Sequence, residues 1–186
     1  MSCVERIMVI GCPGSGKTKF ALKLRRRVNL PIYSLDDYHW KKNWTRFQPK
    51  ESNEWLNVVQ KLADKKQWII EGNYLESIPI RLKRADVVFY LDYPTLLCLW
   101  RSLKRFIKRF FGEKSSLPKV VREDNEYKHL FRIDWNFFKL ILNFRRKQRP
   151  ILLNLLKNCN AQVFRVLNPK QLNFSLDKVQ FNNSEK

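Results

Sequence analysis

The sequence predicts an α/β protein with a parallel β-sheet covered by helices on both faces. Three observations support this fold class. Short apolar runs alternate with stretches of helical periodicity, the runs end at turn-forming or acidic residues, and the 186 residues contain no internal repeat or obvious linker. This alternation is typical of βαβ units. We therefore expect a single domain over residues 1–186.

Five apolar runs are the predicted strands. Each is short, and a short apolar run bounded by turn residues favours a strand buried on both faces of a parallel sheet. The predicted strands cover residues 7–10, 32–35, 68–70, 86–91 and 163–167.

Helical spacing recurs between these runs. Phe20, Ala21, Leu24 and Val28 follow one another at three- and four-residue intervals, and Pro31 ends this first helix. Residues 39–49 show little periodicity and are expected to form a loop. Residues 180–186 are polar and are expected to form a frayed tail. The remaining predicted helices cover residues 54–62, 78–82, 96–111, 120–130, 133–149 and 151–158, with a boundary at Pro150 and a short last helix from Asn168.

The chain is strongly basic. It has 37 Lys and Arg residues against 17 Asp and Glu, a formal net charge of +20. Such a balance favours polyanionic partners, namely nucleotide phosphates, nucleic acid or an acidic membrane surface. A solubilising surface is the alternative interpretation, because charge determines association and solubility rather than activity.

The four cysteines are isolated in the sequence. Cys3, Cys12, Cys98 and Cys159 form no CxxC pair, which argues against a zinc site or a disulfide framework and favours a reducing cytosol. The chain has no signal-peptide pattern and no apolar stretch near the ~20 residues that a membrane span needs. We therefore expect a cytoplasmic protein with no membrane partner.

One glycine-rich segment carries a specific chemical signal. Residues 11–18 match Gly-x-x-x-x-Gly-Lys-[Ser/Thr] at every fixed position, after a predicted strand and before a predicted helix. In this phosphate-binding loop, or P-loop, glycines let backbone N–H groups surround a phosphate, and the N-terminus of the helix points at the anion. The residues expected to bind a nucleoside triphosphate are Gly11, Pro13, Gly14, Ser15, Gly16, Lys17 and Thr18.

Two side chains of the loop have defined tasks. Lys17 is expected to reach the β- and γ-phosphates, and the Thr18 hydroxyl to bind Mg²⁺. The motif does not distinguish a kinase from an ATPase, a GTPase or a nucleic-acid motor.

Acidic residues follow the second and third predicted strands. Ligands of open α/β sheets bind beyond the carboxyl ends of the strands, so these residues are expected near the P-loop. Glu71 is the candidate for holding Mg²⁺ through water, and Asp36 for orienting an attacking hydroxyl or accepting its proton. Strand-end capping is the alternative for the aspartate. Asn73 and Tyr74 are candidates for contact with a second substrate.

A basic helix follows the fourth predicted strand. Arg101 and Arg105 are four residues apart and so share one helix face. Their guanidinium groups could clamp the triphosphate and neutralise charge that develops during transfer, whereas a solvated basic face is the alternative. A second basic cluster, Arg145, Arg146 and Arg149, could close over the site. The candidate catalytic residues are Lys17, Asp36, Arg101 and Arg105.

Together these residues resemble a known group. The chain is similar to the adenylate-kinase-like branch of P-loop proteins and, more narrowly, to the bacterial family of DNA topology modulation proteins (FlaR-like). The resemblance covers about residues 4–175, and its most specific part is the run Trp-Ile-Ile-Glu-Gly-Asn-Tyr. The matching residues are 11–18, Leu35 and Asp36 with Trp40 and Trp44, 68–74, 84–94, Arg101, Arg105 and 135–149.

The resemblance implies a three-layer P-loop NTPase fold with a five-stranded parallel sheet, flanking helices and a helical lid. It implies ATP and Mg²⁺, an acceptor-binding segment over residues 36–60 in which Trp40 contacts the substrate, and a lid over residues 105–149. One departure concerns Glu71, because the family usually has Asp at this position. The longer side chain could still reach a metal-bound water.

The leading hypothesis is a small ATP/Mg-dependent phosphotransferase, a nucleotide- or metabolite-kinase-like enzyme whose acceptor is an unknown small molecule or nucleotide. The alternative is a nucleic-acid-associated ATPase or regulator that affects DNA topology, suggested by the basic charge with interleaved aromatics. A third possibility is a nucleotide-binding switch without catalytic activity.

Overall fold

The computed structural model describes residues 4–40, 52–111, 113, 135–172 and 176, and it contains a five-stranded, all-parallel sheet of order β2-β3-β1-β4-β5. This confirms the predicted fold class. The first strand lies in the centre, with Ile7 beside Ile69 on one side and beside Val87 on the other. The strands are β1 (Arg6–Gly11), β2 (Ile32–Ser34), β3 (Trp68–Glu71), β4 (Val87–Leu91) and β5 (Gln162–Val166).

Burial explains the apolar runs of the sequence. Every residue of β3 and β4 is buried, and so is every residue of β1 after Arg6. A central parallel strand is covered on both faces, so its residues are apolar without alternation. The edge strands β2 and β5 are only partly buried.

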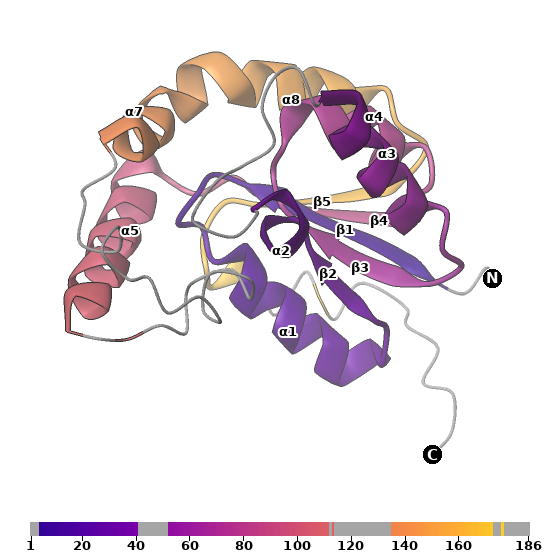
Figure 1. Cartoon of the computed structure of the whole chain (residues 1–186), viewed down its shortest axis with the longest axis horizontal. Coiled ribbons are helices and arrows are strands. Elements are labelled where there is room, and N and C mark those ends of the chain that lie inside the picture. Colours follow the sequence, from indigo (N-terminus) through magenta and orange to yellow (C-terminus); the bar gives the residue numbers. More distant parts are fainter. Residues whose placement is uncertain (1–3, 41–51, 112, 114–134, 173–175, 177–186) are drawn as a thin grey trace.

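Helices cover both faces of the sheet (Figure 1). α1 lies on one face, where Phe20 packs edge-on against Phe89 of β4 at 4.9 Å between ring centroids. α3, α4 and α8 lie on the other face. The helices are α1 (Lys17–Val28), α2 (Leu35–His39), α3 (Ser52–Ala63), η3 (Leu75–Ser77), α4 (Ile78–Leu82), α5 (Thr95–Phe110), α7 (Trp135–Asn143), η5 (Phe144–Gln148) and α8 (Arg149–Lys157).

Most predicted boundaries are shifted by one or two residues, and two differences have a physical reason. The second strand ends at Ser34, and Leu35 instead begins α2, because its side chain is buried against Gly72. The predicted break at Pro150 is a change of helix type, since α7 continues through the π-helical η5 into α8. Pro150 lies in the first turn of α8, where a missing N–H is tolerated.

Some expectations lie outside the described residues. They include the predicted helix over residues 120–130, most of the loop over residues 39–49, the polar tail, and the central part of the predicted lid. In the described segments of the chain, no helix has the length and apolar character needed to cross a membrane.

Candidate active site

The P-loop connects β1 to α1 at the carboxyl edge of the sheet. Ser15 N donates to Cys12 O at 3.0 Å and closes the turn of the loop. Gly14 has φ of 83°, and a Cβ atom there would lie 2.3 Å from the carbonyl oxygen of Cys98 in α5. Only glycine fits this variable position of the motif, because the loop packs directly on α5 there.

Donor groups of the loop are poised for an anion. Lys17 Nζ donates to the carbonyls of Gly11 at 3.0 Å and Cys12 at 3.2 Å, which holds the ammonium over the loop. The Ser15 hydroxyl is buried and has no hydrogen-bond partner among the residues described. A buried polar group without a partner is costly, so this hydroxyl fits a site built for a ligand. α1 begins at Lys17 and directs its first N–H groups to the same place.

Thr18 and Glu71 are brought together as the candidate metal site. Thr18 Oγ1 donates to Glu71 Oε1 at 2.9 Å, and Ser34 Oγ donates to the same oxygen at 2.7 Å. Hydroxyl and carboxylate oxygens are the ligands that Mg²⁺ prefers, so this donor set fits the ion. The longer side chain of Glu71 therefore reaches the P-loop directly.

Burial governs the charge of Glu71. The residue is 2% exposed, and burial, followed by the nearby Asp36 carboxylate, raises its pKa. Lys17 and the hydrogen bonds from Ser34 and Thr18 oppose this shift. A bound cation would favour the ionised form.

Asp36 and Tyr74 form the candidate acceptor side. Tyr74 Oη donates to Asp36 Oδ1 at 2.6 Å, a bond between α2 and the segment after β3. The His39 ring lies 4.4 Å from the Tyr74 ring, and the buried Trp55 ring lies 5.0 Å from it. Asp36 itself is exposed, so its carboxylate is fixed in position and accessible to a ligand.

Trp40 lies at the end of α2, next to this pair. Its backbone N–H donates to Asp36 O at 3.3 Å, and its half-buried ring lies 6.3 Å from the His39 ring. The expected contact of Trp40 with a substrate therefore remains a prediction.

Arg81 positions the segment that carries Tyr74. Its guanidinium is fully buried and donates to the carbonyls of Gly72 at 2.9 Å and Asn73 at 3.1 Å. Gly72 has φ of 139°, and a Cβ atom there would lie 2.9 Å from Leu35 Cβ. These contacts fix the backbone between the metal side and the acceptor side.

Asn73 connects the same segment to the C-terminal helices. Asn73 Nδ2 donates to Gln148 Oε1 of the π-helical η5 at 2.7 Å. The predicted contact of Asn73 is thus with the protein, and a substrate contact stays a prediction.

The arginines of α5 lie in a row beside the loop. Arg101 NH1 donates to Ser15 O at 2.9 Å. Arg105 lies over the Phe137 ring at 5.6 Å, burial lowers its pKa, and it forms no ion pair or hydrogen bond with another described residue. The carboxylates of Asp36 and Glu71 oppose this shift, so both candidate acids act electrostatically on the Arg105 cation.

In the second basic cluster, Arg145, Arg146 and Arg149, one side chain is already bound to another part of the protein. Arg149 Nε donates to both oxygens of Asp92, at 3.0 and 3.1 Å, so this side chain is committed to an ion pair. Arg165 binds the same carboxylate at 2.7 Å. Arg149 therefore fixes the start of α8 to the end of β4, and the hypothesis that it closes over the phosphates is not supported.

Sequence reasoning missed Ser34, Arg81 and Gln148. Ser34 had a detectable signal, because it ends the strand beside β3, where ligands gather. Arg81 and Gln148 gave none, since their contacts depend on the tertiary structure.

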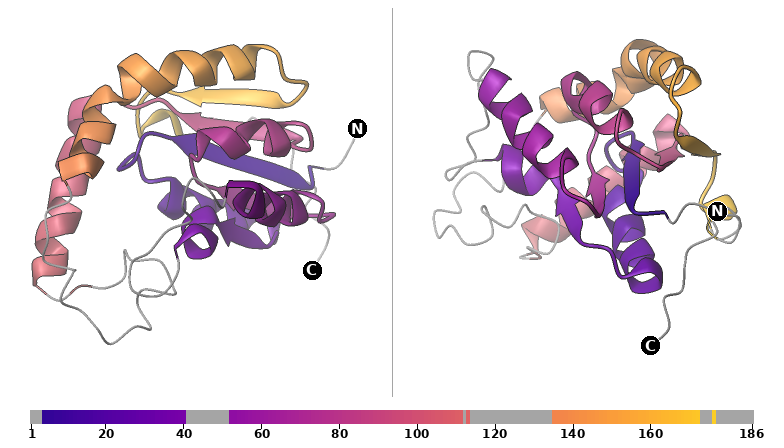
Figure 2. Two further views of the ribbon diagram at one scale, coloured as in Figure 1. Left: turned by 45° about the horizontal axis from the view of Figure 1, so that its top comes forward. Right: turned by 90° about the vertical axis from the view of Figure 1, so that its right-hand side faces the viewer.

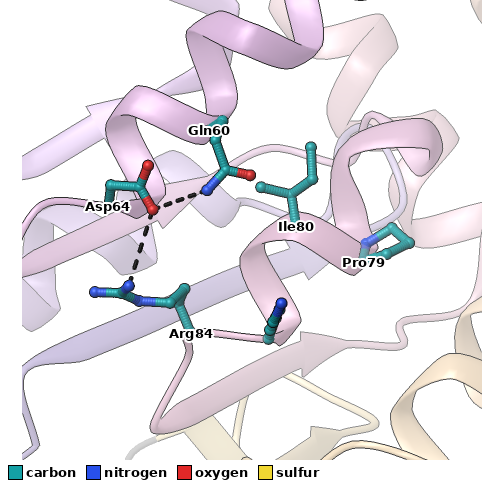
Figure 3. A pocket seen from close by; sticks show the side chains of 6 residues that line it. Gln60, Asp64, Pro79, Ile80 and Arg84 are labelled. Atoms are coloured by element: carbon teal, nitrogen blue, oxygen red, sulfur yellow. Dashed lines mark hydrogen bonds and ion pairs between the residues drawn. The ribbon is translucent and has the colours of Figure 1, made fainter.

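A separate surface hollow of about 370 Å³ lies between α3 and α4. Figure 3 shows Gln60 and Arg84 directed towards Asp64 at its edge. Asp64 and Arg84 precede β3 and β4, so the hollow lies at the opposite edge of the sheet from the P-loop. It is not part of the candidate site.

Comparison with known proteins supports the fold class. No protein-family model matches the chain, and no curated protein matches its sequence. The chain is similar in structure to a sugar kinase from a Janibacter species, with a TM-score of 0.53 and 16% identity over 94% of this chain and 93% of that one. It is also similar to shikimate kinase from Bacteroides thetaiotaomicron, with a TM-score of 0.55 and 14% identity over 94% and 96%.

A third similar structure is shikimate kinase from Acinetobacter baumannii in complex with shikimate, with a TM-score of 0.56 and 14% identity over 95% of this chain and 96% of that one. These likenesses extend over nearly the whole of each chain. The chain therefore has the P-loop α/β fold with a five-stranded parallel sheet.

Proposed function

We propose that this protein is a small ATP- and Mg²⁺-dependent phosphotransferase that phosphorylates a hydroxyl group of a small molecule or nucleotide. The segment from Glu71 to Tyr74 carries the proposal. Its first residue bonds to Thr18 of the P-loop, and its last residue bonds to Asp36. One rigid connection thus joins the phosphate side to the acceptor side, as a transfer reaction requires.

The nucleotide side neutralises charge. Lys17 would bind the β- and γ-phosphates, and the guanidinium of Arg105 would compensate charge on the transferred group. Arg101, which binds the Ser15 carbonyl, would position the loop. Mg²⁺ held by Thr18 and Glu71 would supply further charge neutralisation when bound.

On the acceptor side, Asp36 would accept the proton of the attacking hydroxyl group. The acceptor oxygen would attack the γ-phosphorus, the bond from that phosphorus to the β–γ bridging oxygen would break, and ADP would leave. The proton of the hydroxyl would pass to Asp36, whose orientation Tyr74 fixes. An exposed carboxylate is suited to this task because an incoming ligand can reach it.

The similar structures agree with this proposal, since they include a sugar kinase and shikimate kinases. The narrower relation to the FlaR-like family rests on the run from Trp68 to Tyr74. The nucleic-acid alternative has less support, because the structures that this chain is similar to include kinases of small molecules. Cys12, Cys98 and Cys159 are free thiols, which are typical of the reducing cytoplasm. We therefore place the proposed phosphotransferase in the cytoplasm.

A screen of acceptors tests the proposal. The purified chain would be incubated with ATP, Mg²⁺ and sets of sugars, polyols, hydroxy acids, nucleosides and nucleotides, and products would be detected by mass spectrometry. The proposal predicts a phosphorylated product that disappears in Asp36→Asn. ATP binding without any product would contradict it.

A further inference from the structure

The solvent face of α5 is apolar. Its exposed positions carry four large hydrophobic side chains, Leu96, Trp100, Leu103 and Ile107, which we call the α5 stripe. Leu96 is 80% exposed and Trp100 54% exposed. A helix on the surface of a globular protein normally turns its polar side to solvent. The α5 stripe is therefore oriented opposite to the usual arrangement.

The other side of α5 explains this orientation. Arg101 bonds to the P-loop, Arg105 lies over Phe137 of α7, and Cys98 is buried beside Gly14. The polar side of the helix is thus used by the candidate active site, which leaves the apolar side outward. In Figure 1 and in the left view of Figure 2, α5 lies at the outer edge of the molecule, beside α7.

The stripe has the spacing of one continuous helical face. Its members are separated by four, three and four residues, and at ~1.5 Å rise per residue they span about 17 Å. Single exposed hydrophobic residues are ordinary, whereas a contiguous row of this kind marks an interaction surface.

The charges beside the stripe indicate its partner. The other exposed positions of α5 are Lys104 and Lys108, and the helix contains no acidic residue. Lys104 Nζ lies 4.8 Å from the Trp100 ring centroid, and Lys108 is bonded to Glu113 just after the helix. A second copy in this position would bring lysine towards lysine. An anionic surface suits both the lysines and the +20 net charge.

We propose that the α5 stripe docks this protein onto the surface of an anionic lipid bilayer, with α5 lying in the plane of the interface. Aliphatic side chains and a tryptophan would enter the headgroup region while Lys104 contacts the lipid phosphates. This contact needs no membrane-spanning helix. The sequence led us to expect no membrane partner because it contains no spanning segment, and the proposal departs from that expectation.

Vesicle sedimentation tests the proposal. The full chain would be mixed with phosphatidylcholine vesicles, or with vesicles in which about a quarter of the lipid is phosphatidylglycerol, at physiological and high salt. We expect binding to the anionic vesicles and little to the neutral ones. The double variant Leu103→Gln/Ile107→Gln should lower the affinity at least tenfold, with unchanged melting temperature and ATP binding. Lys104→Gln should weaken both the binding and its salt dependence.

Leu22→Gln is the matched control, because Leu22 is a 49% exposed leucine on α1. It should bind vesicles like the unmodified chain. The proposal is overturned if the unmodified chain does not bind anionic vesicles, or if the double variant binds as well as the control. A dimer in solution that the double variant dissociates would also overturn it, because the stripe would then be covered by a second copy.

Discussion

Thr18 donates a hydrogen bond to Glu71 at 2.9 Å, and this bond joins the first turn of α1 to the last residue of β3. Two residues 53 positions apart in the chain thus meet at the carboxyl edge of the sheet. In the proposed mechanism this pair holds the metal, so it is the first target for testing.

Glu71→Gln should weaken Mg²⁺ binding in the presence of ATP by about tenfold or more, because a neutral amide replaces the carboxylate. Burial raises the pKa of Glu71 above the ordinary glutamate value of about 4.3. In the metal-free protein, Glu71 therefore keeps its proton to higher pH than an exposed glutamate does. Metal binding should then release a proton and strengthen with rising pH. Calorimetry in buffers of different ionisation enthalpy measures both effects, and Glu71→Gln should abolish the proton release.

Lys17→Met should weaken ATP binding by about ten- to a hundredfold, because it removes a charged donor to the phosphates. Lys19→Met is the control, since Lys19 is an exposed lysine two residues along the same helix. A fluorescent ATP analogue reports both affinities. Equal losses in the two variants would show that general charge, not the loop, binds the nucleotide.

Asp36→Asn should lower kcat by about 10²- to 10⁴-fold and leave the affinity for ATP unchanged, because the acceptor hydroxyl loses its proton acceptor. Tyr74→Phe should have a smaller effect, since Asp36 keeps its charge but loses one hydrogen bond. Asp37→Asn is the adjacent-carboxylate control. Steady-state kinetics with an identified acceptor separate these variants, and a larger loss in Asp37→Asn would move the assignment to that residue.

Asp92→Asn should lower the free energy of unfolding by about 2 kcal/mol, because a buried carboxylate is bound by Arg149 and Arg165. Chemical denaturation measures the change. Asp64→Asn is the control, because it removes only an exposed ion pair in which Asp64 lies 3.9 Å from Arg84. It should change the free energy of unfolding by less than about 0.5 kcal/mol.

The same carboxylate predicts a dependence of stability on pH. Burial alone would raise the pKa of Asp92, but hydrogen bonds from Arg149 and Arg165 outweigh burial and lower it. The stabilisation is therefore fully present above the unfolded-state pKa of about 3.9 and is lost as pH falls through the lower folded-state value. In Asp92→Asn, the free energy of unfolding should depend less on pH in this acidic range. An unchanged dependence would show that the ionised Asp92 is not the group responsible.

The sequence predicted those features that depend on local pattern. Buried parallel strands require continuous apolar runs, so the run from Val87 to Leu91 identified β4. Strand-end position predicted that Asp36 and Glu71 lie near the P-loop. The position of Thr18 in the first turn of α1 also follows from its place in the motif, whereas its contact with Mg²⁺ stays a prediction.

Other features depend on distant packing. The ion pair of Arg149 with Asp92 joins residues 57 positions apart, so the sequence could not separate it from the neighbouring arginines. Arg81 resembles any surface arginine until the segment after β3 folds over it. The outward apolar face of α5 was likewise unforeseen, because periodicity does not show which side of a helix meets the protein.

A single-turnover reaction with γ-labelled ATP and the acceptor sets follows the phosphoryl group itself. If one site transfers phosphate from ATP to a hydroxyl group, the label should appear on an acceptor as ADP forms. Asp36→Asn, which still binds ATP, should slow this step. Label that remains on ATP, or that appears only as inorganic phosphate with every acceptor, would show that this protein is not a phosphotransferase for these acceptors.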